Sequence, residues 1–137
     1  PMFDDAADPP EEEFKAVYNK IYKKGVNAFK EQEYPEAIKK LQEAAVGFDA
    51  LIRKYGLSYT LRRRIALSYM YLGAAQLLDA QIEEAKTSFR QANTWFTNYP
   101  LPKAAFEEET PRNMFTQAIE RPGRGASTIV VNASVLG

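Results

Sequence analysis

A pattern that recurs along the chain constrains its fold more than any other feature. The segment YPEAIKKLQEA at 34–44 returns as IEEAKTSFRQA at 82–92, so that Ala37 of the first copy corresponds to Ala85 of the second. Each copy follows a glycine, with alanine twelve residues after it, a bulky apolar residue at sixteen and alanine at nineteen. These positions are Gly25, Ala37, Leu41 and Ala44 in the first block, and Gly73, Ala85, Phe89 and Ala92 in the second.

Small residues let two helices approach closely, and a large residue one turn later fills the space where the helices diverge. The spacing therefore predicts two helix hairpins built to one template, in which glycine on one helix lies against alanine on the other. A recurrence of this kind is typical of helical repeat proteins. A plain four-helix bundle with small residues at its helix crossings is the alternative, because its core would look much the same.

Start and stop signals divide the chain into an all-helical domain and two flanking segments. Residues 1–8 read as a disordered acidic tail, and Asp8 is the expected cap of a helix that starts with two prolines and three glutamates. Residues 122–137 hold a Pro/Gly linker and the β-rich run STIVVNASVLG, which predicts a short strand or extended tail. Between them, at 9–121, apolar periodicity predicts helices at 9–32, 35–55, 58–78, 82–98 and 111–120, with a short helix or loop at 103–109.

The residue types of this chain exclude much of enzyme chemistry. Its 137 residues suit one small domain, and they include no cysteine and no histidine. Disulfides, thiolate metal sites and the commonest general base are therefore absent. An enzyme would have to use carboxylates, lysine or tyrosine, and no spacing brings two acids together in a pocket. We predict a non-enzymatic protein without metal or cofactor, and no apolar run approaches the ~20 residues of a transmembrane helix.

The two blocks resemble the tetratricopeptide repeat family over roughly residues 14–98, with Ile21 leading the first block and Tyr69 and Leu72 leading the second. The resemblance implies a protein-interaction scaffold in which the first helix of each pair lines a groove for a protein or peptide partner. Carried over by position, the groove residues are Tyr22, Val26, Phe29 and Lys30 from the first block, and Met70, Tyr71, Ala74 and Leu77 from the second. The alternative is that these side chains pack on a neighbouring helix. The carboxylate clamp of some family members is absent, because Tyr22 and Val26 occupy its lysine and asparagine positions.

The offset between the two blocks exceeds the family period of about 34 residues. The additional residues lie around Gly56, which predicts about 10 Å of extra helix on each arm and an elongated hairpin end. That end carries Arg53, Lys54 and the triplet Arg62–Arg64, so binding of nucleic acid or phosphate is one alternative function. A hydrolase that uses Glu12, Glu13 or the run Glu107–Glu109 is another. Solvated helix ends and solvated charge runs are the simpler interpretation of both features.

A second resemblance concerns the end of the chain. Helical repeats, a PLPKAAF turn, a helix with MFTQAIE and a β-rich run follow one another as in bacterial cell-envelope proteins that join such repeats to a PEGA-type β domain. It implies that this chain is the N-terminal interaction domain of a longer protein, located in the periplasm or envelope rather than the cytoplasm. Otherwise the run pairs with a partner's sheet edge or with its own copy in a homodimer. Because two repeats bury a thin core, we expect the helix at 111–120, or a second copy of the chain, to cover the second repeat.

Overall fold

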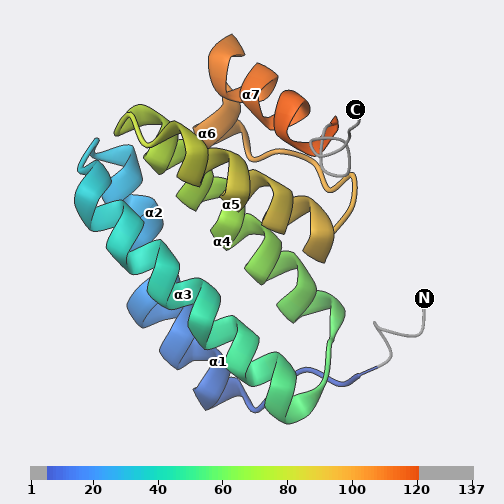
Figure 1. Ribbon diagram of the computed structural model, residues 1–137. Coiled ribbons are helices and arrows are strands. Elements are labelled where there is room, and N and C mark those ends of the chain that lie inside the picture. Colours follow the sequence, from blue (N-terminus) through green and yellow to red (C-terminus); the bar gives the residue numbers. More distant parts are fainter. Residues whose placement is uncertain (1–5, 121–137) are drawn as a thin grey trace.

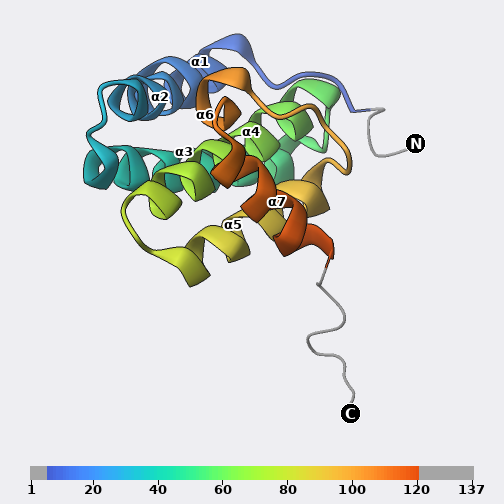
Figure 2. The same cartoon turned by 90° about the horizontal axis from the view of Figure 1, so that it is seen from above.

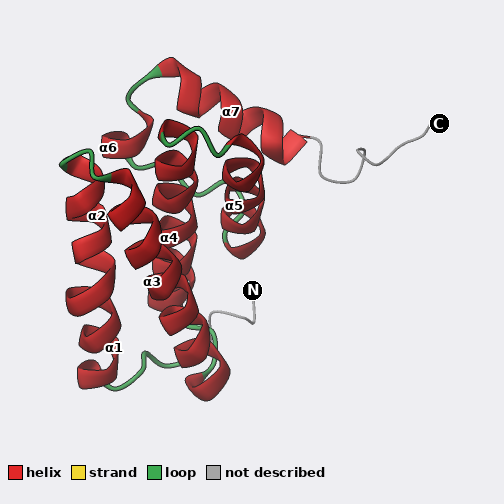
Figure 3. Ribbon diagram, turned by 60° about the vertical axis from the view of Figure 1, so that its left-hand side comes forward, coloured by secondary structure: helices red, strands yellow, loops and turns green. Residues whose placement is uncertain are grey.

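The structure, a computed structural model, describes residues 6–120 of the chain. Every regular element among these residues is a helix, as predicted, and none is a strand (Figure 3). The elements are α1 (Glu11–Val17), the π-helix η2 (Tyr18–Tyr22), α2 (Lys23–Lys30), α3 (Tyr34–Tyr55), α4 (Tyr59–Leu78), α5 (Ile82–Trp95), α6 (Lys103–Phe106) and α7 (Glu109–Glu120). The β-rich run at 127–137, the linker before it and the first five residues of the acidic tail lie outside the described residues.

The helices form successive antiparallel neighbours along the chain (Figure 1). The α1–η2–α2 segment is one continuous helix that packs along α3, α4 returns along α3, and α5 returns along α4. Helix α7 lies against α5, on the side of the molecule remote from α1 (Figures 1 and 2). Helix α4 contacts α2, α3, α5 and α6, which explains why its sequence is apolar around most of its circumference.

The turns within the two helix pairs share one backbone structure at corresponding positions of the two blocks. Gln32 and Ala80 each adopt the left-handed conformation with a φ of 64°. The amide of Glu33 donates to the carbonyl of Ala28 at 2.9 Å, and the amide of Gln81 donates to that of Gln76 at 2.8 Å. This is the Schellman ending of a helix, in which a left-handed residue lets the chain close a six-residue hydrogen bond. The recurrence in the sequence is therefore matched in the backbone.

Within each helix pair, a glycine of the first helix lies against a bulky side chain of the second helix. A Cβ atom built on Gly25 would lie 2.8 Å from Leu41 Cγ, and one built on Gly73 would lie 2.5 Å from Phe89 Cδ1. Carbon atoms do not pack at these distances, so a larger residue at either position would force the neighbouring side chain to shift. The side chains nearest to these Cβ atoms are thus those of Leu41 and Phe89, the bulky residues of the two blocks. Ala37 and Ala85, the alanines predicted to lie against the glycines, are four residues earlier on the same helices and are fully buried.

The extra length of α3 and α4 is packed against other elements instead of projecting beyond them. The Phe14 ring of α1 lies 5.9 Å from the Phe48 ring of α3. A Cβ atom built on Gly47 of α3 would lie 2.9 Å from Val17 Cγ1, so α1 also sits close to its neighbour. The predicted elongated hairpin is present as long helices, but α1 covers the C-terminal half of α3.

The start of α1 and the end of α5 differ from the predicted helix ends. Helix α1 begins after Pro10 without a side-chain cap, so the predicted Asp8 cap is wrong. Ser58 does cap α4, since its Oγ accepts a hydrogen bond from the Leu61 amide at 3.2 Å. Helix α5 ends at Trp95 rather than Asn98, and the chain then turns through Asn98 with a φ of 63°. The π-helix η2 was not predicted.

The C-terminal helix covers the second helix pair, as expected. Phe115 of α7 lies 5.2 Å from Phe89, ring centre to ring centre, and Phe106 of α6 lies 5.7 Å from it. These three rings are all buried. Phe89 is thus held by Gly73 on one side and by two aromatic rings from α6 and α7 on the others.

Candidate functional site

The residues that the family resemblance assigns to a partner groove lie mostly inside the molecule. Five of them are buried, namely Tyr22, Phe29, Met70, Tyr71 and Ala74. Val26 and Leu77 are half-buried, and Lys30 is exposed. The Tyr71 ring centre lies 6.4 Å from that of Tyr22 and 5.7 Å from that of Phe29, which brings α4 and the α1–α2 helix together. The facing surfaces of these helices therefore close on each other, and only three of the eight side chains reach solvent.

An open depression at one end of the molecule, here called the end groove, holds two of those three side chains. Its volume is about 740 Å³, and its walls come from the C-terminal ends of α2 and α4 and from the segment around α6 and α7. Lys30 and Leu77 line it, together with the buried Phe29 and with Leu78, whose side chain is 51% exposed. Glu107 and Glu108 also line it, so its apolar surface is accompanied by a cation and two carboxylates.

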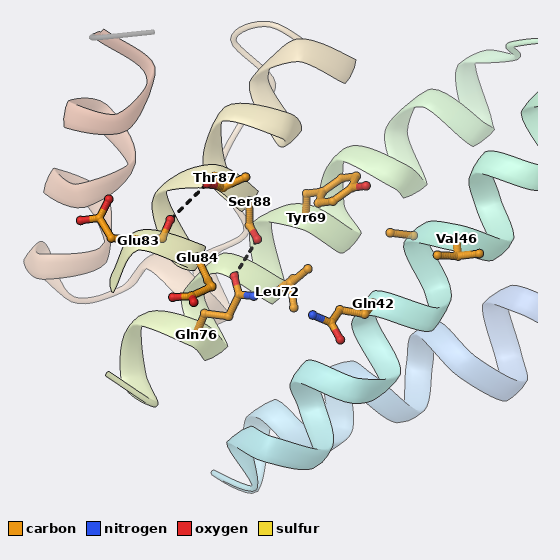
Figure 4. A pocket seen from close by; sticks show the side chains of 10 residues that line it. Gln42, Val46, Tyr69, Leu72, Gln76, Glu83, Glu84, Thr87 and Ser88 are labelled. Carbon is orange, nitrogen blue, oxygen red and sulfur yellow. Dashed lines mark hydrogen bonds between the residues drawn. The ribbon is translucent and has the colours of Figure 1, made fainter. Parts of the chain in front are cut away.

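A second depression, here called the outer groove, lies over α4 between α3 and α5 (Figure 4). Its volume is about 590 Å³. Tyr69, Leu72 and Gln76 of α4 form its floor, Gln42, Ala45 and Val46 of α3 form one wall, and Glu83, Glu84, Thr87 and Ser88 of α5 form the other. Val46 is 70% exposed, the highest value among the large apolar side chains of the described residues.

A hydrogen bond between α4 and α5 fixes the floor of the outer groove. The Ser88 hydroxyl donates to Gln76 Oε1 at 2.6 Å, and both side chains are buried. Sequence reasoning assigned no role to this groove. One signal was available, because Gln76 is a polar residue within the apolar run LGAAQLL, where a buried amide requires partners.

The arginine triplet at the start of α4 binds aromatic rings of the fold. The guanidinium carbon of Arg62 lies 3.9 Å from the Phe96 ring centre, and that of Arg64 lies 4.7 Å from the Tyr18 ring centre. Arg63 Nε donates to the Tyr99 hydroxyl at 2.6 Å. Cation–π contacts of this kind stabilise partly buried surfaces. The triplet therefore joins α4 to η2 and to the segment after α5, which differs from the solvated helix end expected from sequence.

Ionisable groups near these contacts have shifted pKa values with clear causes. Burial raises the pKa of Tyr22 to about 12, and the nearby Arg64 opposes that shift. The Tyr55 hydroxyl donates a hydrogen bond to Glu13, and this bond, more than the neighbouring Lys54, lowers the pKa of that carboxyl group. Glu13 thus belongs to a contact between α1 and α3. It does not line the end groove, which Glu107 and Glu108 border.

Within residues 6–120, no group of acidic side chains is arranged to hold a metal ion. In the same range, no helix combines the length and the apolar character needed to cross a bilayer. No protein-family model, curated protein or solved structure matches this chain.

Proposed function

We propose that this chain is a non-enzymatic protein-interaction module of the tetratricopeptide repeat type, with its two repeats at 14–98. The observation that carries the proposal is the repeated unit. In both blocks a glycine of the first helix lies against a bulky side chain of the second helix. A left-handed Schellman turn also recurs at corresponding positions of the two blocks. The two helix pairs pack side by side, and α7 covers one side of them. Their surface carries the end groove and the outer groove.

The end groove is the proposed partner-binding surface. It holds accessible members of the predicted site, and its exposed Leu78 gives an apolar anchor of the kind that interfaces bury. Lys30 and the carboxylates of Glu107 and Glu108 provide the polar rim that surrounds such anchors. Binding here requires side-chain complementarity and no reacting group.

Nucleic-acid binding through the arginine triplet is the less favoured function. Its guanidinium groups already contact Phe96, Tyr99 and Tyr18, and a hydrogen bond from Arg62 Nε to the Trp95 carbonyl at 3.1 Å fixes their helix further. A carboxylate hydrolase is disfavoured because Glu13 is engaged by Tyr55 and does not line the end groove, which Glu107 and Glu108 border.

A photo-crosslinking experiment tests the proposal. The crosslinking residue p-benzoylphenylalanine is placed at Leu78, or at the exposed Ala50 of α3, which lines neither groove, and the purified chain is irradiated in a lysate of the organism that produces it. We expect a discrete protein adduct from position 78 only, weakened by the charge reversal Lys30→Glu. Equal adducts at positions 78 and 50, or none at either, would contradict the proposal.

A further inference from the structure

The buried carboxamide of Gln76 is only half satisfied by the fold. Gln76 is 4% exposed, and one end of its amide is bound to Ser88 Oγ at 2.6 Å. The other end makes no hydrogen bond to any residue in the range 6–120. Exchanging the oxygen and nitrogen of the amide does not change this, because one of the two atoms is left over in either orientation. Because Gln76 lines the outer groove, the unpaired end of its amide is available to a hydrogen-bonding group of a ligand in that groove.

A second carboxamide faces the same space from the opposite wall. Figure 4 shows the side chains of Gln76 on α4 and Gln42 on α3 pointing toward each other, with Leu72 between them. Unlike Gln76, Gln42 is exposed, and its amide makes no hydrogen bond within the described part of the chain. A carboxamide offers a donor and an acceptor side by side, which is the pattern that a peptide bond of an extended chain complements. The backbone in the middle of a helix cannot satisfy these groups, because its N–H and C=O groups are already bonded to one another.

The charges around the outer groove are of one sign. Glu83 and Glu84 line it, and its lining includes no lysine or arginine. Lys86 pairs with Glu83 at 3.6 Å, whereas Glu84 forms no ion pair with another residue of 6–120. On the other side of the groove from Glu84, the exposed Val46 of α3 presents apolar surface, and the buried Leu72 lies beside it in the floor. The lining therefore complements a ligand that combines a cation, an apolar side chain and an accessible main chain.

We propose that the outer groove binds an extended peptide segment of a partner protein that carries arginine or lysine beside a β-branched or aliphatic residue. The carboxamides of Gln76 and Gln42 hydrogen-bond its main chain, Glu84 pairs with its cation, and Val46 with Leu72 receives its apolar side chain. This inference rests on the proposed function as an interaction module, but it concerns a different surface, formed by the second helix of each pair with α4 as the floor.

The test begins with a phage-displayed library of random ten-residue peptides selected against the whole chain. Enriched peptides are synthesised with a fluorescent label, and their dissociation constants are measured by fluorescence anisotropy. We expect enrichment of arginine or lysine next to valine or isoleucine. Gln42→Leu and Glu84→Gln should each weaken binding about three- to tenfold, the effect of losing one hydrogen bond or one ion pair. Raising the salt concentration should shrink the effect of Glu84→Gln but not that of Gln42→Leu.

Controls separate this inference from the proposed function. Glu12→Gln removes an exposed carboxylate on α1 and should leave the dissociation constant unchanged. Methylating the peptide's backbone nitrogens should abolish binding if the glutamines read the main chain. If Leu78→Asp weakens binding of the selected peptides and Gln42→Leu does not, the peptides bind the end groove. That result would overturn the outer-groove site but would support the proposed function as an interaction module. Absence of enrichment would also overturn this inference, and the crosslink at position 78 then decides the proposed function separately.

Discussion

Replacing Gly73 by alanine tests the packing that defines the repeated unit. The new Cβ would lie 2.5 Å from Phe89 Cδ1, well inside normal contact. The Phe89 ring cannot move away freely, because it is fully buried and its centre lies 5.2 Å from the Phe115 ring and 5.7 Å from the Phe106 ring. Forcing a methyl group into such a core costs about 1–3 kcal/mol.

The higher helix propensity of alanine opposes this packing cost and reduces the expected loss of stability in Gly73→Ala. Alanine in place of glycine favours a helix by about 1 kcal/mol, so the net loss in the free energy of unfolding should be on the order of 0–2 kcal/mol. Urea unfolding followed by circular dichroism measures it, and Ala50→Gly at an exposed site of α3 calibrates the helix-propensity contribution. In a double-mutant cycle, Phe89→Leu should recover roughly 1 kcal/mol of the Gly73→Ala cost. A stabilised Gly73→Ala protein, with no coupling to Phe89→Leu, would refute the reasoning.

Three further predictions concern the turn, the cap and the pH dependence. Ala80→Gly should raise the free energy of unfolding by roughly 0.5–1 kcal/mol in a urea titration, because Ala80 holds a φ of 64° that only glycine adopts without strain; a loss of stability would speak against the left-handed turn. Ser58→Ala should lower it by about 1 kcal/mol, since the Leu61 amide loses its acceptor, and Ser58→Thr, which keeps the hydroxyl at this buried position, should retain more of the stability; equal losses in both variants would exclude capping. The pKa of Tyr22 is about 12 in the fold and near 10 in the unfolded chain. The neutral Tyr22 therefore stabilises the fold fully below pH 10, and this stabilisation is lost as the pH rises from 10 toward 12. The total loss in the free energy of unfolding is on the order of 2–3 kcal/mol. Urea titrations between pH 9 and 11.5 should show this decline, Tyr22→Phe should lack its share of it, and an identical pH profile in both proteins would contradict the assignment.

Helix positions could be predicted from the sequence because strong periodicity and proline signals mark them. The turn residues could not, since Gln32 and Ala80 are neither glycine nor asparagine and give no left-handed signal. The π-helix η2 could not be predicted either, because no residue pattern is specific for the extra residue that a π-helix holds in one turn. In the structure, the Tyr18 ring stacks on the rings of Phe14 and Tyr22 along this segment.

The partner of each glycine was ambiguous for a physical reason. Alanine at twelve and the bulky residue at sixteen lie four residues apart, so both lie on one face of the second helix. Spacing alone cannot tell which of them meets the glycine, and side-chain packing selects the larger one.

The candidate sites were harder to predict than the fold. The predicted groove residues come from the first helix of each pair, and in this fold those helices close on each other through Tyr22, Phe29 and Tyr71. The outer groove depends on the separation of α3 and α5 across α4, which is a property of three helices together. Only the polar Gln76 within an apolar run pointed to it.

Nuclear Overhauser spectroscopy of the isotope-labelled chain tests the repeated unit most directly. The account predicts strong cross-peaks from the Gly25 Hα protons to the Leu41 methyl groups and from the Gly73 Hα protons to the Phe89 ring. Each pair lies at the same place in its helix pair, so both sets should be present together. A spectrum that lacks either set, or that joins the glycines to Ala37 and Ala85 instead, would contradict the proposal that one template was used twice.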